Sequence, residues 1–136
     1  MIQNSFIFLE RVKKGIEQKL WQQGINSWDS FLAANKVRGL SIPRKKYYDR
    51  KIIEARKQLY NFNSAYFKNI LPKSEYYRLY DFFKDDCIFL DIETTGLDSK
   101  NDDITVIGLF DGINSKTMIK NINFDYNRLK DELKNY

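Results

Sequence analysis

The chain has 136 residues, of which 43% are hydrophobic and 15% aromatic, and its net charge is +5. This length allows about one ordinary domain with a hydrophobic core, and the composition excludes a disordered or fibrous chain. The single cysteine, Cys87, cannot form an internal disulfide, so we expect a cytoplasmic protein. No stretch approaches the ~20 apolar residues that span a bilayer, and residues 1–9 lack the features of a signal peptide. We therefore expect neither membrane insertion nor secretion.

The charge is divided unevenly along the chain. Residues 1–84 contain 17 Lys and Arg against 7 Asp and Glu, whereas residues 85–136 contain 6 against 11. Such a division is typical of nucleic-acid enzymes, in which cations hold phosphates and carboxylates hold metal ions. A lysine-rich composition or ordinary solvated helix faces would give the same charge, so the charge alone does not separate the two interpretations.

The spacing of apolar residues predicts a helical hairpin near the start of the chain. Gly24 stands where the first helix would end, and Ser27 where the second would be capped. The first helix would bury one face at spacings of three and four, formed by Leu9, Val12, Ile16 and Leu20. The second would bury Trp28, Phe31 and Leu32.

A longer amphipathic helix is predicted after Pro43, a residue that suits the first helical turn. Its apolar face would consist of Tyr48, Ile52, Ala55, Leu59 and Phe62, and its outer face is basic. We expect four cations of that outer face to bind nucleic acid: Lys45, Lys46, Arg50 and Lys57. The tyrosines of this region either stack on bases or lie in the core. After Leu71 and Pro72, Ser74 is expected to cap a last short helix.

From Cys87 the pattern becomes strand-like. Residues 87–92 form a short continuous apolar run, which is typical of a central strand covered on both faces. Residues 104–110 and 116–120 predict two further strands, antiparallel because only a short Asp111–Gly112 turn separates them. A terminal helix follows, with Asn123 or Asp125 as its cap and an apolar side formed by Tyr126, Leu129, Leu133 and Tyr136. The prediction is an α/β protein, with a helical leader at residues 1–84 and a mixed region at 85–136.

Two carboxylates carry the candidate chemistry. Asp91 and Glu93 are two residues apart on the first predicted strand, so their side chains project to the same side. Their mutual repulsion beside apolar neighbours is costly unless a cation compensates, and oxygen ligands favour Mg²⁺ or Mn²⁺. Two such ions can support phosphodiester hydrolysis. The alternative is that both acids face solvent at a strand end, before a turn at residues 94–96.

The longer segment DIETTGL (residues 91–97), preceded by CIFL, resembles the first motif of the DEDD 3′-to-5′ exonucleases, which are named for their four acidic metal-binding residues. The resemblance implies that Asp91 and Glu93 bind the catalytic metals. It also implies that Thr94, Thr95 and Leu97 lie against the substrate, with Thr94 near the terminal nucleotide and Leu97 near the last base.

The flanking segments narrow the resemblance to the YprB-type branch of ribonuclease H-like proteins. It rests on NSFIFL, GIEQKLWQQGINSWDSFL, AYFKNILPKSEYYRLYDFF, FLDIETTGL and ITVIGLFDG, which together span most of the chain. The resemblance implies a helical leader followed by the first three strands and first helix of a ribonuclease H-like fold. Three positions depart from it: Glu17 replaces the second glycine of a Gly-Ile-Gly turn, and Tyr76 and Tyr77 stand where His and Trp are common.

The resembled fold continues with segments that supply a second Asp, and a third Asp partnered by His or Tyr. The chain has no histidine, and we interpret its remaining acids near the motif as turn formers: Asp98, Asp102, Asp103 and Asp111. We therefore expect an incomplete ribonuclease H-like domain that hydrolyses DNA or RNA with Mg²⁺ or Mn²⁺ only when a second chain supplies the rest, and that is inactive alone. The alternatives are a non-catalytic nucleic-acid-binding remnant that uses the basic leader, and a gene fragment without a function of its own.

Overall fold

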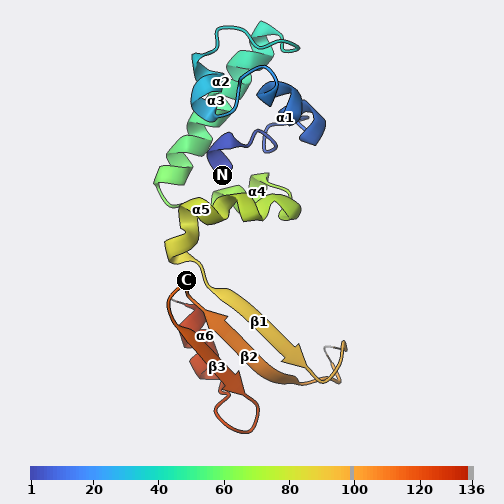
Figure 1. Cartoon of the computed structure of the whole chain (residues 1–136), viewed down its shortest axis with the longest axis vertical. Coiled ribbons are helices and arrows are strands. Elements are labelled where there is room, and N and C mark those ends of the chain that lie inside the picture. The colour runs from blue at the N-terminus through green and yellow to red at the C-terminus, as the bar shows by residue number, and fades with distance from the viewer. Residues whose placement is uncertain (99, 135–136) are drawn as a thin grey trace. The chain divides into compact units, whose positions relative to one another are not determined.

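The computed structural model describes residues 1–98 and 100–134, and the chain divides into two units that we describe separately (Figure 1). The helical unit, Met1–Phe83, contains η1 (Ile2–Asn4), α1 (Lys14–Trp21), α2 (Trp28–Ala33), α3 (Ile42–Tyr60), α4 (Ser64–Ile70), η2 (Lys73–Leu79) and α5 (Tyr80–Phe83). The sheet unit, Lys84–Tyr136, contains η3 (Lys84–Asp86), β1 (Phe89–Thr94), β2 (Ile104–Phe110), β3 (Ser115–Ile119) and α6 (Tyr126–Leu133). The predicted α/β class is confirmed. In the part of the chain that is described, no helix has the length and apolar character needed to cross a bilayer.

Local capping interactions define the hairpin of α1 and α2. Gly24 adopts φ +79°, a left-handed conformation that favours glycine, and its N–H donates to the Trp21 carbonyl at 2.9 Å. Ser27 accepts a hydrogen bond from the Ser30 N–H at 3.2 Å, and the Ser30 hydroxyl accepts one from the Ser27 N–H at 3.0 Å. Both predicted helix boundaries are confirmed.

The buried face of α1 differs from the prediction. Glu17 and Leu20 are buried, whereas Ile16 is 42% exposed. The reason is that α1 begins only at Lys14, after a turn in which Arg11 adopts φ +65°. Leu9 and Val12 are buried too, but they precede the helix and do not share its periodicity. The predicted single helical face is therefore wrong.

The long helix α3 follows the prediction more closely. Ser41 caps it by accepting a hydrogen bond from the Arg44 N–H at 3.4 Å, and Pro43 lies in the first turn. Its buried residues include Tyr48, Ile52, Ala55 and Leu59, as predicted.

The predictions for the segment after α3 are wrong in two places. Phe62 is 62% exposed, because α3 has already ended and Phe62 adopts φ +54°. Ser74 does not cap a helix, since it lies within η2, which follows Pro72 without a side-chain cap. Instead, Asn63 caps α4, a helix that the sequence pattern did not predict, by accepting a hydrogen bond from the Tyr66 N–H at 3.1 Å.

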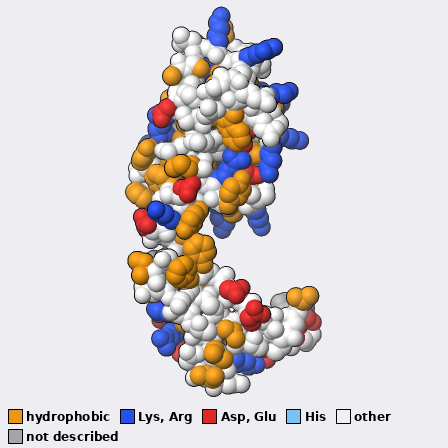
Figure 2. Space-filling view, in the orientation of Figure 1, with side chains coloured by type: hydrophobic (Ala, Val, Ile, Leu, Met, Phe, Trp, Pro, Cys, Tyr) orange, Lys and Arg blue, Asp and Glu red, His pale blue; other side chains and the backbone are white. Residues whose placement is uncertain are grey.

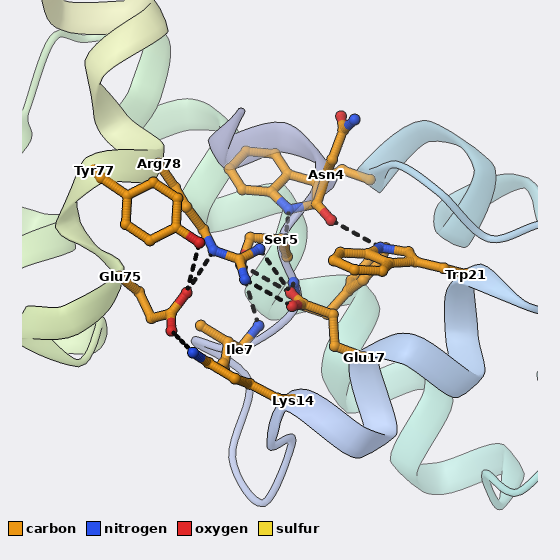
Figure 3. Close-up of polar contacts among 11 residues, drawn as sticks. Asn4, Ser5, Ile7, Lys14, Glu17, Trp21, Glu75, Tyr77 and Arg78 are labelled. Atoms are coloured by element: carbon orange, nitrogen blue, oxygen red, sulfur yellow. Dashed lines mark hydrogen bonds and ion pairs between the residues drawn. The ribbon is translucent and has the colours of Figure 1, made fainter.

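A buried ionic network joins three segments of the helical unit (Figure 3). The Arg78 guanidinium lies between two buried carboxylates, 2.9 Å from Glu17 Oε2 and 2.7 Å from Glu75 Oε2. Glu17 Oε1 also accepts hydrogen bonds from the Phe6 N–H at 2.7 Å and the Ser5 hydroxyl at 3.0 Å. The N-terminal segment and η2 are therefore both bound to α1 through the Glu17 carboxylate. Glu17, the departure from the Gly-Ile-Gly turn, has a structural role here.

The second carboxylate of this network has a further partner. The Lys14 ammonium lies 2.9 Å from Glu75 Oε1. Its hydrogen bond is the main cause that lowers the pKa of Glu75 from the ordinary value, and Arg78 adds to the effect against the opposing influence of burial. These cations thus favour the charged form of Glu75 inside the helical unit.

The sheet unit has the strand order β1-β2-β3 with both pairs antiparallel, and the antiparallel pairing of β2 with β3 was predicted. The second strand has the predicted bounds, and Asp111 forms the turn before β3 by accepting hydrogen bonds from the Ile113 and Asn114 N–H groups at 2.9 and 2.7 Å. Asp125 caps α6, which is one of the two predicted caps. The core consists of Ile107, Leu109 and Met118, with Phe124 and Leu129 among the residues packed on it.

The first strand departs from its predicted environment. It was expected to be covered on both faces, but all six residues of β1 are exposed. The reason is that α6 packs on the core residues of β2 and β3, and β1 is hydrogen-bonded to β2 alone among the described residues (Figure 1). Tyr136, predicted for the apolar side of the last helix, lies outside the described residues.

We predict that Arg78→Met destabilises the helical unit by about 3–5 kcal/mol, because it leaves Glu17 buried without its cation and removes one of the two cations of Glu75. Urea denaturation followed by tryptophan fluorescence measures this effect, since Trp21 and Trp28 both lie in this unit. Asp29→Asn, which breaks the exposed pair with Arg56, serves as control and should cost less than about 1 kcal/mol. If Arg78→Met lowers the free energy of unfolding by no more than the control variant does, the prediction is wrong.

Candidate functional site

The pairing of β1 with β2 determines which face of the sheet carries the acidic residues. Residues paired across antiparallel strands point to the same face, and Leu90 and Ile92 pair with the core residues Leu109 and Ile107. Asp91 and Glu93 alternate with them, so the two carboxylates share the opposite face, away from α6. Both are exposed. The predicted pair therefore lies together on an open surface.

The residue opposite Asp91 leaves space beside it. Asp91 pairs with Gly108 on β2, and a Cβ atom added to Gly108 would have the Asp91 Cβ as its nearest neighbour, at 3.8 Å. Since Gly108 has no side chain, the sheet surface next to the Asp91 carboxylate is bare backbone. On the same face, the Phe89 and Phe110 rings pack with their centroids 6.1 Å apart. An ion or a phosphate can approach the carboxylates from this side.

The loop after β1 is organised by Asp102. Its carboxylate accepts hydrogen bonds from the Thr95 hydroxyl at 3.1 Å and from the Asp98 N–H at 2.7 Å. It lies so close to Gly96 that a Cβ atom there would be 2.5 Å from Asp102 Oδ2. The Thr95 N–H in turn donates to the Asp103 carbonyl at 3.0 Å. Asp102 was predicted as a turn former, but its contacts with Thr95 and Gly96 were not, although the glycine in the motif was a signal that some group approaches closely there.

The three residues assigned to the substrate occupy different environments. The Thr94 hydroxyl donates to the Gly96 carbonyl, at the end of β1 where the pairing register shifts. The Thr95 hydroxyl is engaged within the loop, as described above. Leu97 is fully exposed, so its side chain can contact a ligand. Thr94 and Leu97 therefore flank the end of the strand that bears Glu93, while Thr95 holds the loop together.

Two carboxylates form only part of a metal site. Across residues 1–98 and 100–134 there is no group of three or more His, Cys, Asp or Glu residues that could hold a metal ion. Asp98 accepts hydrogen bonds from the Lys100 N–H and the Asn101 side chain, which lower the pKa of Asp98. Asp102 and Asp111 also bind loop N–H groups, which confirms these three as turn formers, and Asp103 forms an ion pair with Lys120. The oxygen ligands Asp91 and Glu93 suit Mg²⁺ or Mn²⁺ but do not complete its coordination.

The basic face of α3 is smaller than predicted. Lys46, Arg50 and Lys57 are exposed, but Lys45 is buried, 6% exposed, and its ammonium lies 2.6 Å from Asp49 Oδ1. The same nitrogen lies 4.8 Å from the centre of the Phe31 ring. The predicted position of Lys45 on the outer face is therefore wrong, because α2 packs against this side of α3 and covers it.

The tyrosines of this region divide between core and surface. Tyr48 is buried and its hydroxyl donates to the Glu10 carbonyl at 2.6 Å, whereas Tyr60 is 59% exposed. Tyr47 donates to the Glu10 carboxylate, and Tyr66 is partly buried. Tyr48 is thus a core residue and is not available to stack on a base.

We predict that Gly96→Ala disrupts the loop after β1, because the new methyl group would collide with the hydrogen-bonded Asp102 carboxylate. Amide hydrogen exchange should become at least about tenfold faster at Thr95 and Asp98, whose N–H groups are protected within this loop. Gly108→Ala is the matched control in the same sheet, since its methyl group would meet only an ordinary contact. Unchanged exchange at both amides in Gly96→Ala would refute the role given to Asp102.

The similarity of this chain to known proteins lies in the sheet unit. No curated protein and no solved structure matches the chain significantly. Proteins of the RNase H superfamily act on nucleic acids and generally use divalent metal ions. The family model of this superfamily matches residues 88–135, a range that includes all three strands, α6 and both candidate carboxylates.

Proposed function

We propose that the chain takes part in metal-dependent hydrolysis of phosphodiester bonds in DNA or RNA, in the manner of a 3′-to-5′ exonuclease. The observation that supports this proposal is the position of Asp91 and Glu93, which share the open sheet face beside Gly108 within the segment that matches the RNase H superfamily. Two solvent-accessible carboxylates on one rigid strand are suited to hold a divalent cation against a phosphate.

Each residue of the site has a distinct role in this proposal. Asp91 and Glu93 bind Mg²⁺ or Mn²⁺, which activates a water molecule and stabilises the leaving oxygen when bound. Thr94 and Leu97, at the end of β1, receive the terminal nucleotide, with the exposed Leu97 side chain against the base. Thr95 and Asp102 keep this loop in one conformation, which reduces the entropy lost when the substrate binds.

A second chain completes the site in this proposal. Two carboxylates cannot fix an ion for in-line attack, so further ligands must come from elsewhere. In the described part of the chain β2 is the one strand paired with β1, so a partner strand can pair along the opposite edge, and Leu90 and Ile92 on β1 are 47% and 44% exposed. Pairing there would cover these apolar side chains and bring new residues beside Asp91 and Glu93. We accordingly expect the isolated chain to be inactive.

The alternative function is nucleic-acid binding by the helical unit without catalysis. Lys46, Arg50 and Lys57 are exposed on α3, and Figure 2 shows Lys and Arg side chains at several places on the visible face of this unit. The imbalance of 17 cations against 7 acids in residues 1–84 supports it. Such binding depends on phosphates and not on base sequence.

We predict that the wild-type chain binds Mn²⁺ with a dissociation constant on the order of millimolar, because it offers only two carboxylate ligands. The Asp91→Asn, Glu93→Gln double variant should bind at least about tenfold more weakly. Electron paramagnetic resonance of free Mn²⁺ measures both affinities. Asp125→Asn is the control, since it removes one acid from the same unit while Asn preserves the helix cap.

Equal Mn²⁺ affinity in the wild type and the double variant would contradict the proposal that Asp91 and Glu93 bind a metal ion. The same proteins can be incubated with end-labelled single-stranded DNA and RNA, where we expect hydrolysis at the background rate. Hydrolysis by the wild type that disappears in Asp91→Ala would support the nuclease assignment, but would show that no second chain is needed.

For the alternative function, we predict sequence-independent binding of single-stranded DNA that weakens steeply with salt. Replacing Lys46, Arg50 and Lys57 together by Gln should reduce the magnitude of the slope of log K against log salt concentration by about 2, because three phosphate contacts are lost and each contributes about 0.7 on a single strand. Fluorescence anisotropy at several salt concentrations measures this slope. Binding that is absent at low salt, or that does not respond to salt, would exclude this function.

A further inference from the structure

The helical unit contains a pocket that none of the functions above uses. Its volume is about 890 Å³, which falls within the roughly 300–1,000 Å³ typical of small-molecule sites. Residues of the turn before α1, of α1, of the turn before α3 and of the first turns of α3 line it. Val12, Leu20 and Tyr48 contribute buried apolar surface, and the more exposed Ile16 and Leu40 complete the apolar part of its wall.

The charged residues of this pocket are all cations. Arg11, Lys19, Arg38 and Arg44 line it, and its lining includes no Asp or Glu. In the described residues none of these four forms an ion pair with a carboxylate, whereas four other cations of the same unit do: Lys14, Lys45, Arg56 and Arg78. The pocket therefore concentrates positive charge that the protein itself does not neutralise, which favours an anionic ligand.

The arginines and the apolar wall of the pocket together indicate which class of anionic ligand it can bind. Three of the four are arginines, whose planar guanidinium matches phosphate oxygens with two parallel hydrogen bonds. The Arg44 guanidinium lies 5.6 Å from the centre of the Tyr48 ring, which restricts its orientation. Ile16 is 42% exposed beside these cations and offers a surface for a flat apolar group. A phosphate attached to a nucleoside satisfies both features, whereas an acidic peptide satisfies only the charge.

Hydrogen bonds within the protein hold the wall of this pocket. The Gln23 side chain accepts a hydrogen bond from the Arg38 N–H at 3.0 Å and donates one to the Lys19 carbonyl at 2.9 Å, so it ties the turn that carries Arg38 to α1. In that turn the Leu40 N–H donates to the Val37 carbonyl at 3.1 Å, and Gly39 adopts φ +87°. A wall held in place by these contacts loses little conformational entropy on binding.

We propose that this pocket binds a nucleoside monophosphate unit, either as the free nucleotide or at the end of a nucleic-acid strand. The phosphate lies among Arg11, Arg38 and Arg44, and the base lies against Ile16 and Leu40. The site shares no residue with the carboxylate pair on β1 or with the exposed cations of α3. Nucleotide binding in this pocket can therefore be tested independently of metal binding by Asp91 and Glu93.

The test uses a variant that removes cations without disturbing the fold. Arg11 adopts φ +65°, a conformation in which glycine is favoured, so Arg11→Gly deletes a cation while relieving backbone strain. Combined with Arg38→Gln, it removes two charges from the pocket and keeps the backbone N–H that binds Gln23. The matched control is Lys68→Gln with Lys73→Gln, which removes the same charge from exposed positions of the same unit that lie outside the pocket lining.

Isothermal titration calorimetry with AMP and dTMP is the first measurement, with adenosine, inorganic phosphate and hexaglutamate as comparison ligands. We expect AMP or dTMP to bind the wild type more tightly than all three, and the Arg11→Gly, Arg38→Gln variant to lose about tenfold or more in affinity. The control variant should change by less than about twofold. Short oligonucleotides with and without a terminal phosphate then distinguish the free nucleotide from a strand end.

Several outcomes would overturn the proposal. One is that neither free nucleotides nor phosphorylated strand ends bind, and another is that both double variants lose the same affinity, which would indicate unspecific charge attraction. Equal binding of hexaglutamate, in competition with AMP, would identify an acidic-peptide site instead. Retained nucleotide binding in the Asp91→Asn, Glu93→Gln variant is expected in every case that supports the pocket.

Discussion

The antiparallel pairing of β1 with β2 is the constraint on which the candidate site depends. It places Leu90 and Ile92 on the face of the core residues Ile107 and Leu109, and thereby turns Asp91 and Glu93 to the other face. The same pairing sets Gly108 opposite Asp91, where any larger residue would occupy the surface beside the carboxylate. A shift of the register by one residue would exchange the two faces and turn both acids toward the side of the core.

The helical unit depends on a different kind of contact. Arg78 bridges Glu17 of α1 and Glu75 of η2, and Glu17 also binds the backbone of the N-terminal segment. A buried ion pair adds little net stability compared with apolar packing, but it specifies which segments meet, because each unpaired charge would be costly. This contact also determines which residues of α1 line the cationic pocket. With Glu17 and Leu20 turned inward, Ile16 and Lys19 are left on the side of α1 that lines the cationic pocket.

The two proposed sites divide the chemistry of a nucleic-acid enzyme between the two units. The carboxylates proposed to hold metal ions lie in the sheet unit, and the arginines proposed to hold a phosphate lie in the helical unit. The uneven charge along the chain reflects this division, but charge did not identify the relevant cations. Lys45 belongs to the basic stretch and is buried against Phe31, whereas Arg11 and Arg38 lie outside that stretch and face the pocket.

The sequence by itself determined the features that depend on neighbours in the chain. The turn at Gly24 after α1, the N-caps of α2 at Ser27 and of α6 at Asp125, the extent of β2, and the common face of Asp91 and Glu93 follow from local hydrogen bonds and side-chain periodicity. Only the tertiary structure decided which face of α1 is buried, that Lys45 is covered, that Ser74 caps nothing, and that β1 is exposed on both faces. It also gathered Arg11, Lys19, Arg38 and Arg44 around one pocket. These outcomes depend on contacts between distant segments, whose energies a local pattern does not contain.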